Sequence, residues 1–169
     1  GSESGDTQWT AITYGNGKFM AVGGSGDERF MYSTDGINWN TDVGLKTGNY
    51  HAIVYADNKW VVGSWDNGGN IKSSADDGFT WANAVVEDAD MDVCALAYGN
   101  GRFVAVGDTG DNRIMYSDNG TDWTAVVAPA MLNWKGLTFG NGMFVAVANN
   151  SGAASAEPVM YSANGINWT

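Results

Sequence analysis

The chain has 169 residues, a formal net charge of −11 at pH 7, one cysteine and 24 glycines. Because this charge repels duplex nucleic acid and anionic membrane surfaces over most directions of approach, we predict neither as a partner. The single cysteine excludes an intrachain disulfide, and no apolar run is long enough to predict a membrane-spanning helix. The first residues also lack the basic start and apolar stretch of a signal peptide.

One sequence unit of about 42 residues occurs four times along the chain. Its clearest part, Tyr-Gly-Asn-Gly-Lys-Phe-Met-Ala-Val-Gly from residue 14, recurs from residues 98 and 139 and, in altered form, from residue 55. The tryptophans that close the units, Trp39, Trp81, Trp123 and Trp168, are 42, 42 and 45 residues apart. We therefore predict a single domain of four repeats, over 9–49, 50–92, 93–133, and 134–169 together with 1–8.

Each unit is predicted to contain four β-strands. The first covers 9–14, 51–55, 93–98 and 134–139, and the turn after it supplies the positive φ angles that a tight hairpin needs. The third covers 29–33, 71–74, 113–117 and 159–162, and the fourth follows the tryptophan, as at 81–86 and 123–127. The first two strands are apolar at nearly every position, which is typical of sheets packed on both faces. This pattern predicts an all-β fold, a β-propeller of four four-stranded blades.

A second recurring sequence block ends at each closing tryptophan. Residues 74–81 read Ser-Ala-Asp-Asp-Gly-Phe-Thr-Trp and match the pattern Ser-x-Asp-x-Gly-x-Thr-Trp of the Asp-box, or BNR, repeat. The chain thus resembles sialidase-like and sortilin-like Asp-box propellers, although the other three copies are one residue shorter and two carry asparagine for aspartate. In that family the box is a structural turn, so the resemblance implies a scaffold role for Ser33, Asp35, Gly36, Trp39, Ser74, Asp76, Gly78, Trp81, Ser117, Asn119, Gly120, Trp123, Ser162, Asn164, Gly165 and Trp168.

The ends of the chain bear on how the ring closes. Only Thr169 follows the last tryptophan, whereas eight residues precede Trp9. We predict that residues 1–8 form the fourth strand of the last blade and close the ring, which would pair an otherwise open sheet edge. The alternative is a partial array completed by oligomerisation, such as two chains that together form eight blades.

Function is expected where the four copies differ, namely in the loops after the second strand and at the start of the first strand. Aromatic rings beside aspartate and asparagine are what sugar recognition requires, because a ring face stacks on C–H groups while the polar groups bond hydroxyls. Trp65 is the strongest candidate because it breaks the repeat inside a polar loop. The complete set of candidate ligand-binding residues is Trp65, Asp66, Asn67, Trp9, Tyr50, Trp134, Asp27, Asp108 and His51.

We predict a non-catalytic binding module, with a carbohydrate or a cell-surface protein as its partner. The repeat is similar to repeats of phage structural proteins and bacterial surface proteins, which implies an extracellular or virion-surface location. The alternatives are a structural or protein-interaction propeller and, third, a glycoside hydrolase. Sialidases require three converging arginines, whereas Arg102 of this chain is predicted at the opposite end of the blades from Arg29 and Arg113. No catalytic residue, cofactor or metal is predicted, and the loop at 108–112 is interpreted as a solvated acidic loop rather than a calcium site.

Overall fold

The computed structural model describes residues 7–41, 44–66, 71–149 and 157–169. The described residues form β-strands joined by turns and short loops, and they include no helix of the length and hydropathy needed to cross a membrane. Residues 1–6 of the predicted closing segment, and the candidate site residue Asn67, lie outside the described residues.

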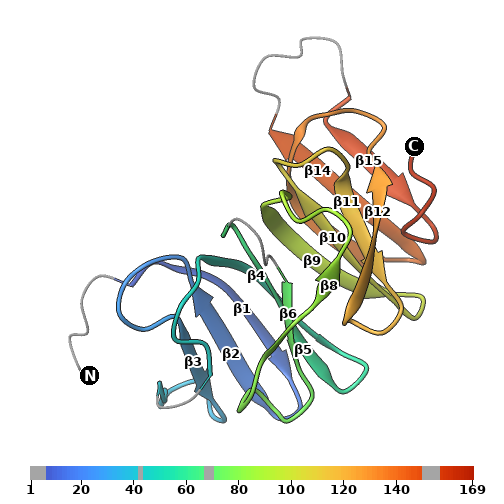
Figure 1. The fold of residues 1–169 in the computed structure, drawn as a ribbon. Helices are drawn as coiled ribbons and strands as arrows, with labels where there is room; N and C mark the ends of the chain where they lie inside the picture. The colour runs from blue at the N-terminus through green and yellow to red at the C-terminus, as the bar shows by residue number, and fades with distance from the viewer. Residues whose placement is uncertain (1–6, 42–43, 67–70, 150–156) are drawn as a thin grey trace.

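The strands form four sheets, one for each predicted repeat (Figure 1). The first sheet contains β1 (Trp9–Gly15), β2 (Lys18–Gly23) and β3 (Phe30–Ser33), and the second contains β4 (Tyr50–Ala56), β5 (Lys59–Ser64), β6 (Ile71–Ser74) and β7 (Ala82–Asn83). The third contains β9 (Val93–Gly99), β10 (Arg102–Gly107), β11 (Arg113–Ser117) and β12 (Asp122–Val127), with β8 (Val85–Val86) at its edge. The fourth contains β13 (Asn133–Gly140), β14 (Met143–Asn149) and β15 (Val159–Ser162). We call these sheets blades 1 to 4.

The first two strands of every blade are joined by a two-residue hairpin. In blade 1, Gly15 pairs with Lys18, and the turn residues Asn16 and Gly17 have φ angles of 46° and 77°. Asparagine and glycine adopt positive φ at low cost, and this conformation matches the right-handed twist of the flanking strands. The turns of the other three blades have the same form, so the predicted hairpins are present throughout.

The fourth strand is the least regular element. In blade 3 it is β12, which pairs with β11 along four residues. In blade 2 the predicted strand over 81–86 is divided: β7 pairs with β6, whereas β8 leaves blade 2 and pairs in parallel with β12 of blade 3. In blade 1 it is reduced to a single bridge between Tyr32 and Asn40. The segment after Trp81 therefore joins two blades instead of completing one.

The core lies between the blades. One cluster of buried residues joins blades 1 and 2, a second joins blades 2 and 3, and a third joins blades 3 and 4. The inner strands β1, β4, β9 and β13 contact one another in that order. Because each sheet is apolar on both faces, face-to-face stacking of successive blades buries both faces of the middle two.

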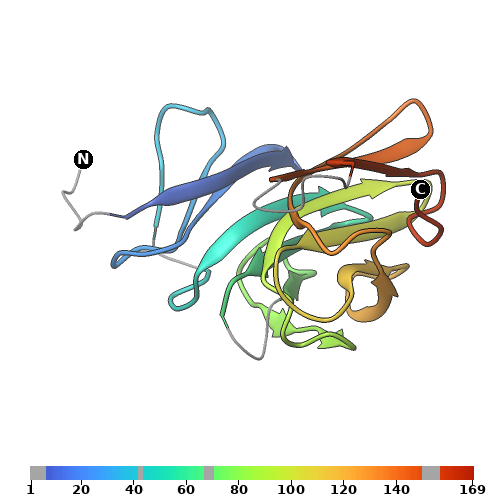
Figure 2. The ribbon, with the colours of Figure 1, turned by 90° about the horizontal axis from the view of Figure 1, so that it is seen from above.

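The four blades are arranged as an open arc. Blades 1 and 4, which contain the first and last strands, lie at its two opposite ends in both views (Figures 1 and 2). Among the described residues, the buried clusters connect only neighbouring blades. The described residues thus form an open arc of four blades, and completion of a ring by a second chain stays a prediction.

Residues 1–8 were predicted to pair with the last blade and close the ring. The two described residues of this segment, Thr7 and Gln8, lie beside blade 1 instead. The Gln8 N–H donates to the Ser25 carbonyl at 3.3 Å, and the Gly24 N–H donates to the Gln8 carbonyl at 2.9 Å. Thr7 and Gln8 therefore belong to blade 1. The reason is that Gln8 directly precedes β1, so its backbone groups find partners in the adjoining loop of the same blade.

Candidate functional site

One residue near the start of every inner strand lies in a β-bulge, the second residue in β1, β4 and β9 and the third in β13. The pairing of β1 with β2 passes from Trp9 to Ala11, and an equivalent shift occurs in blades 2, 3 and 4. A bulge leaves one residue outside the regular ladder and changes the direction of its side chain, which is common beside binding sites. The four bulge residues are Thr10, His51, Cys94 and Lys135. They occupy the same end of the four inner strands, which we call the channel mouth.

Trp65 lies at the channel mouth, directly after β5. Its indole stacks on the His51 ring, with the ring centroids 3.6 Å apart and an angle of 5° between the planes. Asn49 holds both residues: its carbonyl accepts from the Trp65 N–H at 2.9 Å, and its side-chain oxygen lies 2.9 Å from Nε2 of His51. Asp66 in turn accepts from the Asn49 N–H at 2.8 Å. The indole is therefore held in one orientation by its neighbours.

Lys135 connects the mouth of blade 4 to blades 2 and 3. Its Nζ lies 4.8 Å from the centroid of the Trp65 ring and 3.6 Å from Sγ of Cys94, and it forms an ion pair with Asp108. Asp108 follows β10, so the ion pair joins residues of two neighbouring blades. Three of the four bulge residues thus belong to one contact network that includes Trp65 and Asp108.

The electrostatics of this network follow from burial and the Lys135 charge. Burial lowers the pKa of His51, and the neighbouring Lys135 lowers it further. Burial also raises the pKa of Cys94 to about 11, with the Asp108 carboxylate adding to the shift. For Lys135, burial lowers the pKa, but the hydrogen bond to Asp108 and the further interactions with Cys94 and Asp108 together outweigh burial and raise it. At neutral pH the network therefore contains a neutral imidazole, a thiol and a lysine–aspartate ion pair, which is a poor set for nucleophilic catalysis.

Several buried polar atoms of the channel mouth have no hydrogen-bond partner among the described residues. They are the indole Nε1 of Trp65, Oδ1 of Asp108, and Nε and Nη1 of Arg113. Arg113 also has a φ of 69°, a left-handed conformation that is uncommon for a residue with a side chain. Unpaired buried polar groups and strained backbone both tend to occur at binding sites.

A cavity of about 160 Å³ lies just below the mouth, between the inner strands of blades 1, 2 and 3. It is lined by Ala11, Ala52, Ile53, Ala95 and Leu96, with His51 and Cys94 at the bulge positions. The lining is therefore apolar except at the bulge residues, and a ligand that enters the mouth meets polar groups first and a small apolar wall behind them.

The other candidate residues are placed as follows. Tyr50 and Trp134 are each 1% exposed, and both bond backbone carbonyls, those of Thr47 and Ala130. These two rings belong to the core between blades and present no face to a ligand. Their equivalent in blade 1, Trp9, is 41% exposed because no blade precedes it. Asp27 is exposed in the β2–β3 loop.

Three members of the network were not predicted as site residues: Lys135, Cys94 and Asn49. When the four repeats are aligned with one another, Cys94 and Lys135 fall at the same position as His51. The variation at this position between the repeats could have indicated these residues. The bulge that turns these side chains toward the mouth depends on strand register, which the sequence pattern alone does not show. Asn49 lies in a loop that differs in length and composition between the repeats, so no comparison of copies singled it out.

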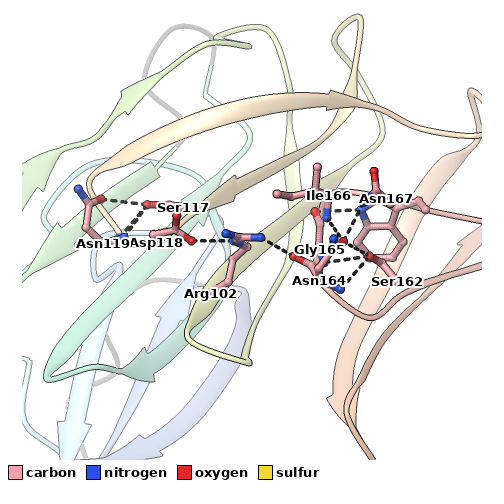
Figure 3. Close-up of polar contacts among 11 residues, drawn as sticks. Arg102, Ser117, Asp118, Asn119, Ser162, Asn164, Gly165, Ile166 and Asn167 are labelled. Atoms are coloured by element: carbon pink, nitrogen blue, oxygen red, sulfur yellow. Dashed lines mark hydrogen bonds and ion pairs between the residues drawn. The ribbon is translucent and has the colours of Figure 1, made fainter.

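The opposite end of the blades contains the four turns that the sequence predicts as Asp-boxes, and we call them the Asp-box turns. In blade 4, Oγ of Ser162 accepts from the Gly165 N–H at 2.9 Å, and the side chain of Asn164 accepts from the N–H groups of Ile166 and Asn167 (Figure 3). The equivalent bonds occur around Ser33, Ser74 and Ser117. Polar groups of these turns are thus used within the turns themselves.

Neighbouring blades are also joined at this end. Arg102 donates to its own blade's Asp118 and to the carbonyl of Asn164 in the next blade, both at 2.7 Å (Figure 3). Lys18, at the same repeat position in blade 1, forms an ion pair with Asp77 of blade 2 at 2.6 Å. Arg102 therefore lies at the opposite end of blade 3 from Arg113, and the three arginines do not converge as a sialidase site requires.

Comparison with known proteins gives a fold but no family. No family model and no curated protein matches the chain. It is similar to the solved structure of YCF48 bound to a D1 peptide, with 18% identity and a TM-score of 0.62 over 97% of this chain and 52% of that chain. It is also similar to a structure of the nidogen/laminin complex, with 12% identity and a TM-score of 0.62 over 86% and 54%. The fold is a β-propeller. The predicted all-β propeller is thereby confirmed, and this propeller chain spans about half the length of both neighbours.

Proposed function

We propose that this propeller is a non-catalytic binding module whose channel mouth recognises a segment of another protein. The observation that carries the proposal is a pair of buried groups without a hydrogen-bond partner among the described residues, the indole N–H of Trp65 and Oδ1 of Asp108. A buried polar group left unpaired costs roughly 1–3 kcal/mol, so a ligand that pairs with both atoms gains that stabilisation on binding.

A peptide unit supplies the two complementary groups. Its carbonyl can accept from Trp65, and its N–H can donate to Asp108. Both site residues contact the same lysine, since Lys135 lies 4.8 Å from the Trp65 ring and is ion-paired with Asp108, so one short segment can reach both. The two structural neighbours, one with a bound D1 peptide and the other in a nidogen/laminin complex, support a protein ligand rather than a small molecule.

The charge of the chain favours a basic segment. The net charge is −11, and the carboxylates of Asp66, Asp92 and Asp108 interact electrostatically around Lys135. An acidic surface attracts cationic partners and repels anionic ones, with the largest effect on the rate of association. We therefore expect tighter binding to segments that carry lysine or arginine beside the amide that occupies the site.

A carbohydrate ligand is the second candidate, based on the aromatic and acidic residues of the loops. Sugar recognition by Trp65 needs a free indole face, but His51 stacks on this ring at 3.6 Å and Lys135 lies over it. The stacking partners that a sugar would provide are already present within the protein, which favours the peptide ligand.

The test is parallel binding of the 169-residue chain to an array of twelve-residue peptides of graded charge and to a glycan array. We expect binding to a subset of basic peptides. Trp65→Phe keeps a ring on His51 but removes the N–H donor, and it should weaken that binding roughly tenfold, as the loss of one buried hydrogen bond predicts. Asp108→Asn should weaken it as well.

Phe79→Ala is the matched control, because Phe79 is an exposed aromatic residue at the Asp-box end, 62% exposed. It should leave peptide binding unchanged. Binding to glycans and to no peptide would reject the proposal in favour of the carbohydrate ligand. Equal effects of Trp65→Phe and Phe79→Ala would show that the channel mouth is not the site.

A further inference from the structure

Each blade has two apolar faces. At every interface within the chain, the same face of one blade packs against the opposite face of the next blade. We call the face of a blade that contacts the following blade its forward face, and the opposite face its rear face. Between blades 3 and 4, the forward face consists of Ala97, Val104, Val106 and Ile114, and the rear face of blade 4 consists of Trp134, Phe144, Ala146 and Met160. All eight residues are between 0% and 7% exposed. Equivalent residues form the interfaces of blades 1 with 2 and 2 with 3.

The forward face of blade 4 has the same chemistry but no blade against it. Val147, Val159 and Tyr161 are 49%, 48% and 48% exposed. At the equivalent positions of blade 3, Val106 and Ile114 are both 0% exposed. The register pairs Val147 with Val159 and Val145 with Tyr161, so these side chains form one continuous patch across β14 and β15.

The rear face of blade 1 is uncovered in the same way. Ile12 and Tyr14 are 58% and 59% exposed, whereas Ile53, which corresponds to Ile12 in blade 2, is 8% exposed. The two ends of the arc therefore present the two halves of an interface that the chain forms internally three times.

A more specific match concerns the residue that ends each inner strand, which is glycine in blades 1, 3 and 4 and Ala56 in blade 2. A Cβ added at Gly15 would overlap the ring of Tyr55 in the next blade, and one added at Gly99 would overlap the ring of Phe139. Glycine is thus required at these two positions, because an aromatic ring of the following blade lies on the backbone. Gly140 is the equivalent residue of blade 4, and a Cβ there would meet no described atom within 4 Å. Its slot is empty.

Tyr14 is the ring that lacks such a slot. It occupies the repeat position of Tyr55 and Phe139, and it is 59% exposed, with the Phe19 ring of its own blade 4.8 Å away. The chain therefore carries one unfilled glycine slot at one end of the arc and one unpaired aromatic ring at the other.

We propose that two copies of this chain associate head to tail, with the forward face of blade 4 of each copy on the rear face of blade 1 of the other and Tyr14 on Gly140. A heterologous contact of this kind makes a closed ring only if the rotation between copies closes. The arc corresponds to 52% and 54% of the lengths of the two neighbouring chains, so two arcs have about the length of one neighbouring chain. Each exposed end face is then covered by the opposite end face of a second copy. The residues of these two faces match those of the interfaces within one chain.

The test is the mass of the chain in solution, measured by light scattering over a range of concentrations. We expect twice the 17.9 kDa of one chain, with a concentration-dependent shift toward one chain on dilution. A single-chain mass at every concentration would overturn the proposal, as would growth into open filaments, and either result would leave these faces to other blades or another partner.

Gly140→Val is the sharpest variant. Its side chain meets open space in the single chain, so the fold should be retained, but it would fill the slot of Tyr14 and should reduce the mass to that of one chain. Val147→Glu should act in the same direction by placing a charge on the forward face. The matched control is Val127→Glu, an exposed valine of β12 that is 69% exposed and away from both end faces, which should leave the mass doubled. A doubled mass in Gly140→Val would also overturn the proposal.

Discussion

The two ends of the blades use polar and aromatic residues in opposite ways. At the Asp-box end, the same serine, aspartate or asparagine, and glycine bonds occur in all four copies, and the acceptors are used within each turn. At the channel mouth, the equivalent bulge positions hold four different residues, and their contacts cross from blade to blade. Some polar atoms there have no partner among the described residues.

This difference separates scaffold from site without an alignment of homologues. A turn that satisfies its own backbone can be repeated unchanged, whereas the contacts that such turns make with the neighbouring blade, such as Lys18 with Asp77 and Arg102 with Asn164, differ between the copies. The four bulge positions have the same backbone role but hold four different side chains, so that role does not determine which side chain is present. Nε1 of Trp65 and Oδ1 of Asp108, which are buried without a hydrogen-bond partner among the described residues, lie in the variable network and are the atoms with which the proposed ligand would pair.

We expect the largest difference between the Asp-box end and the channel mouth when Trp60 and Trp65 are each replaced by alanine and the free energy of unfolding is measured. Trp60 is 0% exposed in the core between blades 1 and 2, and its Nε1 donates to Asp77 of an Asp-box at 3.1 Å. Trp60→Ala should lower the free energy of unfolding by about 3–5 kcal/mol, because it removes a large buried ring and leaves a cavity. Urea unfolding followed by circular dichroism measures the change.

Two variants control this experiment. Trp60→Phe installs the residue found at this position in the other three repeats and should recover most of the loss. Trp65→Ala should cost less than Trp60→Ala, because Trp65 is only partly buried and lies outside the three buried clusters. Equal losses for Trp60→Ala and Trp65→Ala would contradict the division into scaffold and mouth.

The fold was predictable because its determinants repeat. The Asn-Gly turns and the closing tryptophans define four hairpin-rich units, and the structure has four sheets at these positions. Ring closure was harder to predict, because it depends on where the backbone groups of a few residues such as Gln8 find partners. The sequence shows the length of that segment but not its pairing.

The site was predictable only in part, for a related physical reason. Trp65 was predicted because it breaks the repeat, and the structure places it at the channel mouth, where its role in binding stays a prediction. Trp9, Tyr50 and Trp134 are alike in the sequence, yet Tyr50 and Trp134 are buried and Trp9 is not. Their exposure depends on whether a preceding blade covers them, which is a property of the assembled arc. The ion pair of Lys135 with Asp108 likewise forms only because successive blades stack.

A second, smaller effect concerns the two kinds of Asp-box. The Asn38 backbone N–H, the Asn38 side-chain amide, the Ile37 N–H and the Ser33 hydroxyl all bond the Asp35 carboxylate and lower its pKa well below the usual value. An aspartate whose pKa is lower in the folded state stabilises the fold at pH above its unfolded pKa of about 3.9, and this stabilisation is lost as the pH falls toward the folded-state pKa. Asn119 and Asn164, at the same position, cannot titrate in this way.

Asp35→Asn therefore makes the first box like the third and fourth. We expect the wild-type chain to have the higher melting temperature at pH 7, with the difference shrinking as the pH falls below about 4. Asp111→Asn, at an exposed aspartate outside the boxes, controls for the loss of one negative charge. A difference between wild type and Asp35→Asn that grows on acidification would show that the carboxylate does not stabilise the turn in its charged form.

The smallest effect tests the contact network of the mouth directly. His51 is the only histidine of the chain, so its imidazole can be titrated by proton NMR without assignment ambiguity. Burial lowers its pKa first, Lys135 lowers it further, and Asp108 and Asp66 raise it. Lys135→Met should therefore raise the pKa of His51, since it removes a positive charge and leaves the Asp108 carboxylate unpaired. Lys46→Met removes a charge from an exposed loop and should leave the pKa unchanged. A pKa that stays constant or falls in Lys135→Met would mean that Lys135 does not lie over Trp65 beside His51, and the mouth would lose the residue that connects its blades.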